Sequence, residues 1–259
     1  MPLPPLVEPV DSLSAAERAR TARHTSLAAL GSLGQRRLAA AHVALVGAGG
    51  IGSPVLLALA AAGVGRITVI DDDVVELANL QRQIAHRIDD LGTSKAESAV
   101  RAAAAVSPET VVIAERERLD ATNAERLLAD ADVVVDGSDT FATREAVAAA
   151  CDRLGVPLVW GTVQELHAQA TVFWSAPPAG VDPVVLGDLY PAGSGDAAPT
   201  CAQVGVLGAL CVQLGGILAI EVVKLVTGIG EPLLGRVLVI DALGAHQREI
   251  AVRAATVSA

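Results

Sequence analysis

Short apolar runs alternate with alanine-rich segments through the middle of the chain. The runs are rich in Val, Ile and Leu, which is typical of strands buried on both faces of a parallel sheet. We expect five such strands, at residues 42–47, 66–71, 109–115, 131–136 and 156–161. The segments between them favour helices, at residues 52–62, 94–106, 121–128 and 142–154. This alternation predicts an α/β fold with a doubly wound, mostly parallel sheet and helices on both faces.

The second half of the chain follows a different pattern. Antiparallel strands are expected to extend the sheet there, at residues 166–173, 235–241 and 246–252. Residues 175–200 are rich in Pro, Gly, Ala and Asp, so they are expected to form a long crossover loop. Residues 201–228 are apolar and end at Gly228, which predicts one helix or a broken pair of helices.

The amino-terminal segment is proline-rich at its start and polar afterwards. Ser14 and Glu17 have capping-box spacing, which predicts a short polar helix ending near Arg20. No internal repeat or linker divides the rest of the chain. We therefore expect a mobile extension, a single domain and a tail, at residues 1–19, 20–253 and 254–259.

Composition excludes several classes of protein. The chain has 259 residues, 52% of them hydrophobic, and a net charge of −10, so it is neither disordered nor basic enough to favour a nucleic-acid partner. Residues 43–65 form a run with Ser53 as its only polar side chain, which is long enough to span a bilayer. The run also holds six glycines and a proline, which favours a buried strand, turn and helix over a membrane segment.

The location of the protein is suggested by its cysteines and its first residues. Cys151, Cys201 and Cys211 form neither a metal-binding pair nor a disulfide framework. The first ten residues lack a basic region followed by an apolar core, so no signal peptide is expected. Both features favour a cytoplasmic protein without a membrane partner.

A glycine-rich turn follows the first predicted strand. Gly47, Gly49 and Gly52 match the G-x-G-x-x-G pattern between a strand and a helix, and Gly50 lies within it. Glycines let the backbone approach a phosphate, and the helix start supplies N–H groups and the positive end of a dipole. Asp71 ends the second strand, where an acid can bind ribose hydroxyls. The turn and the acid predict a Rossmann-like nucleotide site, with the nucleotide left open.

Further charged and polar side chains follow the predicted strands. They are Asp73, Asn79, Arg82, Gln83, Lys95, Asp139 and Arg144. A dinucleotide with one pyrophosphate does not need two extra cations and another acid. A triphosphate does, because Arg and Lys spread its charge and a carboxylate can hold Mg²⁺. Individually, such a charged residue is more often a solvated surface residue. Their joint placement at the carboxyl ends of successive strands, where open α/β sheets bind ligands, favours a binding site instead.

These motifs resemble those of the ThiF/MoeB/HesA family, bacterial relatives of ubiquitin-activating enzymes. The matching strings are GAGGIGS (47–53), D-x-D-x-V-E-x-x-N-L-Q-R-Q (71–83), G-x-x-K (92–95), D-x-x-D-x-x-x-x-R (136–144), T-C-x-x-x-G-V-L-G (200–208) and E-x-x-K-x-x-x-G (221–228). The resemblance implies a single ATP-binding adenylation domain. Its implied activity is adenylation by Mg-ATP of the C-terminal glycine of a small ubiquitin-like sulfur-carrier protein, with release of pyrophosphate.

The resemblance also implies a role for each matching residue. Gly49 would lie beside the phosphates and Asp71 would hold the ribose. Asn79, Arg82 and Lys95 would contact the phosphates, and Asp139 would bind Mg²⁺. The remaining implied nucleotide-binding residues are Gly47, Gly50, Gly52, Asp73 and Gln83.

Two more residues have implied catalytic roles. The string R-T-A-R-H (20–24) is similar to the family's R-Y-x-R-[QH], with Thr21 in place of tyrosine. Arg23 would then reach into the ATP site of a partner subunit in a homodimer; alternatively, it is solvated on a terminal helix. Cys201 would take over the activated carrier, since a position beside a helix start favours the thiolate. The alternative is that Cys201 is a small buried apolar residue without a catalytic role.

The sequence departs from the family's zinc pattern. Many members hold structural zinc through two C-x-x-C pairs, but Val185 and Asp188 stand where the first pair would be. The tail contains no cysteine, so no structural zinc is expected. The chain ends after the predicted hairpin, so no appended sulfurtransferase domain is expected either.

Three other functions are compatible with parts of the pattern. Family relatives activate peptide amides or a threonyl group on transfer RNA, which makes related adenylation of another carboxylate or amide the first alternative. An NAD-dependent oxidoreductase would explain the glycine turn and Asp71 but not Arg82, Lys95 and Asp139. A non-catalytic interaction subunit is the third, since Thr140 stands where relatives often have Asn.

Overall fold

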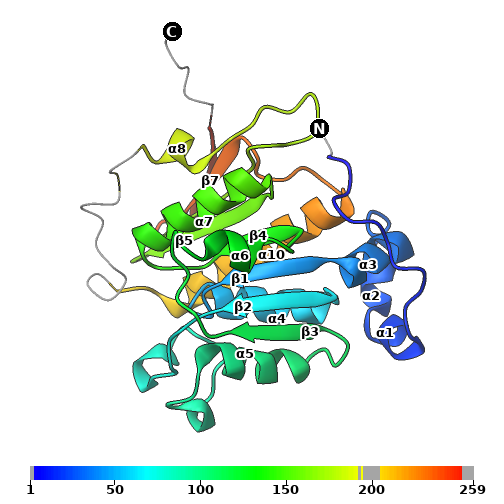
Figure 1. Cartoon of the computed structure of the whole chain (residues 1–259), viewed down its shortest axis with the longest axis horizontal. Coiled ribbons are helices and arrows are strands. Elements are labelled where there is room, and N and C mark those ends of the chain that lie inside the picture. Colours follow the sequence, from blue (N-terminus) through cyan, green and yellow to red (C-terminus); the bar gives the residue numbers. More distant parts are fainter. Residues whose placement is uncertain (1–2, 192–193, 195–204, 253–259) are drawn as a thin grey trace.

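A single mixed sheet forms the centre of the molecule (Figure 1). The computed structural model describes residues 3–191, 194 and 205–252. Within them, eight strands lie in the order β3-β2-β1-β4-β5-β6-β7-β8. Their bounds are β1 His42–Val46, β2 Arg66–Ile70, β3 Val111–Glu115, β4 Val133–Asp136, β5 Leu158–Gln164, β6 His167–Phe173, β7 Arg236–Asp241 and β8 His246–Ala251.

The direction of the strands follows the prediction. Strands β3, β2, β1, β4 and β5 are parallel, and β6, β7 and β8 continue the sheet in antiparallel pairs. In β1, Val43 and Leu45 belong to one buried apolar cluster, whereas Ala44 and Val46 belong to another on the opposite face. The expected α/β fold, a doubly wound, Rossmann-like, mostly parallel sheet extended by antiparallel strands, is therefore confirmed.

Helices cover both faces of this sheet. Helices α6 and α7 lie on one face, and α4 and α10 lie on the other (Figure 1). The helices are α1 Ala15–Arg20, α2 Ala22–Thr25, α3 Gly31–Ala40, α4 Gly52–Ala62, α5 Lys95–Ala104, α6 Ala124–Leu128, α7 Phe141–Leu154, α8 Leu186–Leu189 and α10 Gly208–Thr227, with short 3₁₀ turns η1 Leu77–Asn79 and η2 Ile88–Asp90.

The two long apolar runs are parts of the core. Residues 43–65 contain β1, the glycine-rich turn and α4, as predicted. In the other run, residues 208–227 form helix α10, which ends at Gly228 in a left-handed conformation. By length and composition α10 is able to cross a membrane, but 56% of its apolar window is buried inside the protein. It contacts α4, α3 and the strands β5 and β6, which accounts for its apolar sequence.

The amino-terminal segment is fastened to the domain. Leu3 and Val7 are buried in the same apolar cluster as α10. The Leu6 N–H donates to the Leu225 carbonyl at 3.1 Å, and a further backbone bond joins residue 10 to α3. These contacts correct the expectation of a mobile extension. That expectation rested on the prolines of residues 1–10, whereas Leu3 and Val7 between them are buried against the domain.

Strand order fixes where a ligand can bind. The sequence order of the strands reverses between β1 and β4, which are neighbours in the sheet. The connections after these two strands leave on opposite sides, so a crevice opens at their carboxyl ends. The glycine-rich turn follows β1, and Gly137 to Thr140 follow β4, so both contribute to this crevice.

Candidate functional site

A cavity of about 380 Å³ lies at the carboxyl ends of the parallel strands. Most of the residues predicted to bind nucleotide line it: Gly47, Gly49, Gly50, Asp71, Asp73, Asn79, Arg82, Gln83, Lys95 and Asp139. They come from three connections, which follow β1, β2 and β4. The structure therefore brings together in one cavity the glycines, acids and cations that the motifs singled out.

The glycine turn, residues 47–52, forms the floor where β1 ends and α4 begins. Gly47 has a φ of +86°, which favours glycine over residues with a side chain. Gly52 does not line the cavity: a Cβ there would lie 1.8 Å from the Gly47 carbonyl oxygen. Gly52 therefore has a packing role, in which it lets the turn fold closely onto the helix, and its expected nucleotide-binding role stays a prediction.

Asp71 joins the second strand to the glycine turn. Its carboxylate accepts hydrogen bonds from the Ala48 N–H at 2.7 Å and the Asp73 N–H at 2.9 Å. Burial raises the pKa of Asp71, and these bonds and the charge of Lys95 oppose that shift. Each carboxylate oxygen has a second lone pair, so contact with a ribose hydroxyl is compatible with both bonds.

Lys95 is the buried cation of the site. It begins α5, and its Nζ donates to Asp73 Oδ2 at 2.7 Å. The Lys95 side chain is only 9% exposed, whereas that of Asp73 is 56% exposed. Arg82 is partly exposed and donates to the Ala78 carbonyl at 3.2 Å. The site thus combines one cation that an acid holds in place with a second cation on a partly exposed side chain.

Asn79 and Gln83 stabilise the wall between these cations. Asn79 Oδ1 accepts from the Glu76 N–H at 3.1 Å, which caps the turn η1. Gln83 is almost fully buried, and its Oε1 has no hydrogen-bond partner among the described residues. A buried acceptor without a partner is costly, so Gln83 is suited to receive a donor from a ligand in the cavity.

Asp139 is the acid available for a divalent cation. It is exposed on the cavity wall directly before Thr140, the N-cap of α7. Mg²⁺ is commonly held by one or two carboxylates together with phosphate oxygens and water, so a single acid fits it. Over the described ranges, no group of three or more His, Cys, Asp or Glu could hold a metal ion. The expected absence of structural zinc stays a prediction.

Three side chains beside Asp139 were only partly foreseen. Asp136 is fully buried; its Oδ1 accepts from the Ser138 N–H at 2.8 Å and burial raises its pKa. Arg144 donates to the Ser138 carbonyl and to Thr162 Oγ1, both at 3.0 Å, and lies 5.6 Å from the centre of the Trp160 ring. Asp136 Oδ2, Arg144 Nε and Trp160 Nε1 have no partner within the described part of the chain.

The unpartnered polar atoms of Asp136, Arg144 and Trp160 indicate what this part of the cavity can bind. Buried polar atoms without partners are rare, and here they adjoin a residue, Arg144, that lines the cavity. A guanidinium with an unused N–H is suited to bind a carboxylate. Arg144 was recognised in the sequence as a cation, whereas Asp136 and Trp160 were not identified as part of the site. The position of Asp136 at the end of β4 was the available signal.

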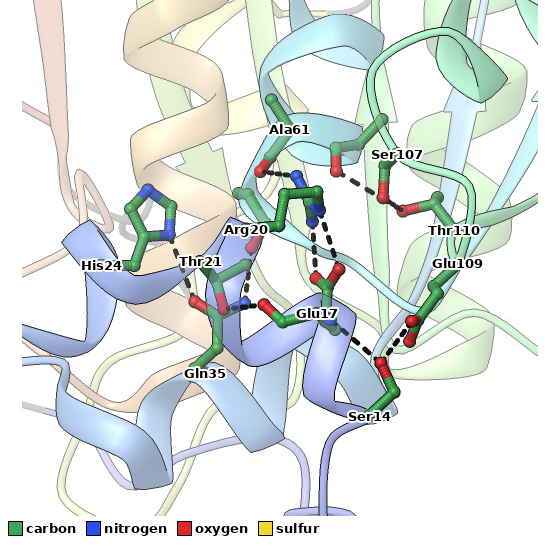
Figure 2. Close-up of polar contacts among 12 residues, drawn as sticks. Ser14, Glu17, Arg20, Thr21, His24, Gln35, Ala61, Ser107, Glu109 and Thr110 are labelled. Atoms are coloured by element: carbon green, nitrogen blue, oxygen red, sulfur yellow. Dashed lines mark hydrogen bonds and ion pairs between the residues drawn. The ribbon is translucent and has the colours of Figure 1, made fainter.

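The residues of the R-T-A-R-H string do not line the cavity, and Figure 2 shows the contacts that Arg20, Thr21 and His24 make instead. Arg20 pairs with the buried Glu17 and donates to the Ala61 carbonyl at 2.6 Å. Gln35 donates to the Ala62 carbonyl at 2.7 Å and lies 3.2 Å from His24 Nδ1. Both carbonyls belong to the last turn of α4, so these residues cap that helix. The predicted cap of α1 is present as well, since Ser14 Oγ accepts from the Glu17 N–H.

Arg23 is exposed and does not line the cavity of its own chain. It lies in α2, next to residues that bind the carboxyl end of α4, whereas the glycine turn lies at the amino end. An 11-residue helix separates these ends by about 16 Å. Any contact of Arg23 with nucleotide would therefore come from a second copy of the chain.

The cysteines have different surroundings. Cys201, the candidate nucleophile, lies outside the described residues. Cys151 is buried in α7, and burial raises its pKa, in agreement with the expected packing role. Cys211 is also buried but forms part of the cavity wall, where a Cβ on Gly50 would lie 3.1 Å from its Sγ. The sequence predicted its burial but not its place in the site.

Comparison with known proteins assigns the chain to a family. The model of the ThiF family matches residues 21–258. The probable adenylyltransferase/sulfurtransferase MoeZ of Mycobacterium tuberculosis is 47% identical over 97% of this chain, which spans 64% of MoeZ. The SAMP-activating enzyme E1 of Haloferax volcanii is 42% identical, covering 90% of this chain and 84% of that enzyme. The sulfur carrier protein adenylyltransferase of Thermus thermophilus is 41% identical, covering 89% and 86%.

Solved structures agree with this assignment. E. coli MccB with ATP aligns with a TM-score of 0.80 over 95% of this chain and 74% of MccB, at 23% identity, which supports the fold alone. The E. coli dehydratase TcdA, in complex with ATP, is 30% identical, with a TM-score of 0.58 over 62% of this chain and 68% of TcdA. Because the family model spans nearly the whole domain and several relatives exceed 40% identity, the chain belongs to the ThiF family.

Proposed function

We propose that the protein is an ATP-dependent adenylyltransferase that activates the C-terminal glycine of a small ubiquitin-like sulfur-carrier protein. The observation that carries this proposal is the placement of Arg82, Lys95 and Asp139 on one cavity with the glycine turn. Two cations and an acid suit a triphosphate better than a dinucleotide. The names of the Haloferax and Thermus relatives supply the class of substrate.

The reaction follows from the charges in the cavity. A carboxylate oxygen of the carrier attacks the α-phosphorus of ATP, the bond from that phosphorus to the bridging oxygen breaks, and pyrophosphate leaves. Charge grows on the leaving group, and preplaced cations stabilise it more than they stabilise the bound substrate. Arg82 and Lys95 supply these cations, and Arg144 would orient the attacking carboxylate. No general base is needed because the nucleophile is already an anion.

Magnesium would be held at Asp139. Bound Mg²⁺ neutralises phosphate charge, and a single exposed carboxylate beside the phosphate site is the arrangement it commonly uses. The remaining roles follow the residues that line the cavity. Gly49 would approach the phosphates, Asp71 would hold the ribose, and Asn79 and Gln83 would complete the wall.

A homodimer would complete the site. Arg23 lies at the wrong end of α4 for its own cavity, so its catalytic role requires a second subunit. Helix α10 exposes Val212 and Ile220, with Leu207 exposed just before the helix, and such apolar side chains suit a subunit contact. Cys201 would act after adenylation, taking the carrier's acyl group as a thioester and releasing AMP. The protein would work in the cytoplasm, without nucleic acid or a membrane as partner.

The proposal is tested by intact-mass spectrometry of candidate carriers. Each carrier ending in glycine is incubated with the protein, ATP and Mg²⁺, and a matched carrier lacking its last glycine serves as the control. We expect the mass of the intact carrier to rise by one AMP moiety, or the carrier to become linked to the protein. Failure with every carrier, together with binding of NAD in preference to ATP, would refute the proposal.

A further inference from the structure

His86 lies buried beside the glycine turn and has no role in the reaction described above. His86 follows Ala48 by 38 residues in the sequence, and its Nε2 lies 2.9 Å from the Ala48 carbonyl oxygen. The residue is 6% exposed. Ala48 sits between Gly47 and Gly49, so His86 contacts the backbone of the turn itself.

The proton position on His86 is fixed by its partners. A carbonyl oxygen only accepts, so Nε2 must carry the hydrogen of the bond to Ala48. Nδ1 lies 2.8 Å from Ser98 Oγ, which in turn lies 2.9 Å from Asp90 Oδ2, and Arg101 pairs with Asp90. The Ser98 hydroxyl donates its one hydrogen to Asp90, so the assignment rests on the Ala48 carbonyl, which requires a hydrogen on Nε2 whether or not Nδ1 carries one. Burial lowers the pKa of His86.

The Ala48 carbonyl is held by a second donor as well. Ser53, fully buried in the first turn of α4, donates to the same oxygen at 3.1 Å. The preceding N–H of Ala48 is bound by Asp71. Three side chains from separate segments thus fix the two peptide groups that flank Ala48.

A trans peptide group transmits this restraint to Gly49. The carbonyl of Ala48 and the N–H of Gly49 belong to one planar unit and point in opposite directions. Because His86 and Ser53 hold the oxygen on the buried side, the N–H of Gly49 points away from them, and Gly49 lines the cavity. Among the described residues, no backbone or side-chain group accepts a hydrogen bond from this N–H.

We infer that His86 is a positioning residue that aims the Gly49 N–H at a phosphate of the bound nucleotide, with Ser53 as its second support. The inference rests on the nucleotide site proposed above but not on the carrier or on the adenylation step. The competing explanation is that His86 only fills space and stabilises the fold. The two differ in what a substitution changes: affinity for phosphate, or stability alone.

Two substitutions separate the ring nitrogens. In His86→Gln the amide nitrogen takes nearly the place of Nε2 and keeps a donor for Ala48. In His86→Asn the amide nitrogen takes the place of Nδ1 and the bond to Ala48 is lost. Dissociation constants for ATP and for adenosine are measured by calorimetry and competition, with melting temperature measured without ligand. Adenosine carries no phosphate, so it reports any general damage to the site.

His42 provides a matched control at the other end of β1. It also makes two ring hydrogen bonds, to the Asp130 carbonyl and to Thr68 Oγ1, both at 2.8 Å. His42→Asn should lower the melting temperature and leave the ratio of the ATP and adenosine constants unchanged. A similar change of ratio in His42→Asn and His86→Asn would overturn the inference.

We expect His86→Gln to bind ATP within about threefold of the parent protein and His86→Asn to bind about tenfold more weakly, the worth of one well-placed hydrogen bond. Adenosine affinity should be unchanged in both. Equal ATP affinity of the two variants would refute the inference. Should His86→Asn not fold, Ser53→Ala decides: weaker ATP binding by about threefold supports the inference, and unchanged binding refutes it. A protein that binds ATP as expected but adenylates no carrier would refute the proposed function and leave this inference intact.

Discussion

The two ends of helix α4 carry motifs of the same family but perform different tasks. At the amino end, the glycine turn opens onto the cavity, where Lys95, Arg82 and Asp139 gather. At the carboxyl end, Arg20 and Gln35 bind the last carbonyls of the helix. The first end is arranged for a ligand, and the second fastens α1–α3 to the domain.

Helix physics explains the division. The amino end of a helix presents N–H groups and partial positive charge, which suit phosphate, and the carboxyl end presents carbonyls and partial negative charge, which suit a cation. Arg20 supplies that cation, and the buried Glu17 holds it in place. A match to a family motif therefore locates a residue in the fold but does not by itself give its role. Both motifs lie at an end of α4, and the chemical groups at each end determine whether the motif residues suit a ligand or bind the helix itself.

The largest expected effect is at the cavity end. Asp139→Ala should lower ATP–pyrophosphate exchange by about 100-fold or more, because phosphate charge loses its metal partner. Stability should be unchanged, since the side chain is exposed. Asp120→Asn, an exposed acid after β3, is the control and should keep full activity. If Asp139→Ala catalyses exchange at the rate of the control, Asp139 does not hold the metal ion.

The second prediction concerns Arg23, which in the proposed homodimer would reach the cavity of the partner subunit. Arg23→Ala should lower exchange by about 100-fold without loss of stability, because an arginine supplied in trans stabilises charge in the transition state. Mixing Arg23→Ala with Asp139→Ala in equal amounts should restore about a quarter of parental activity. About half of the dimers then contain one copy of each variant, and one of the two sites in each such dimer is intact. If mixing restores nothing while both variants still assemble, Arg23 does not act across subunits.

The third prediction addresses the carboxyl end of α4. Arg20→Ala should lower the free energy of unfolding by about 2–3 kcal/mol, because Glu17 is left buried without its cation and a helix carbonyl loses its donor. Arg18→Ala, two residues away and exposed, should change it by less than about 0.5 kcal/mol. ATP affinity should be the same in both variants, as measured by calorimetry. Weaker ATP binding by Arg20→Ala, but not by Arg18→Ala, would contradict the claim that the carboxyl end of α4 has no part in nucleotide binding.

The smallest expected effect is on pH dependence. Burial lowers the pKa of His86 from its ordinary value of 6.5, with Lys95 adding to the shift and Asp71 and Asp90 opposing it. Between the folded pKa and 6.5 the unfolded chain therefore binds more protons, so stability falls as the pH falls through that window. Urea unfolding of the parent protein should show this loss, and His86→Gln should show a flatter profile. Identical profiles would contradict a neutral buried His86.

The fold was predictable because its signals are local. Apolar runs such as residues 42–47 and 131–136 define strands, and Gly47 marks the turn between a strand and a helix. The burial of Leu3 and Val7 was not predictable in this way, because it depends on α10, which lies more than 200 residues later. The dominant local signal there, proline, favoured a mobile segment instead.

The cavity lining was predictable for residues whose charge suits a ligand, and less so for residues that act on the backbone. Asp71, Lys95 and Asp139 carry charge types that suit a triphosphate. Gly52 matches the same motif, but its role depends on the Gly47 carbonyl above it. His86 touches Ala48 across 38 residues, a pairing that has no local pattern.

The most direct test of the account is ATP–pyrophosphate exchange with carriers that end in glycine. Exchange should require Mg²⁺ and an intact carrier, and it should be lost when the last glycine is removed. Exchange that is independent of any carboxylate substrate, or its absence with every carrier under conditions where ATP binds, would contradict the account.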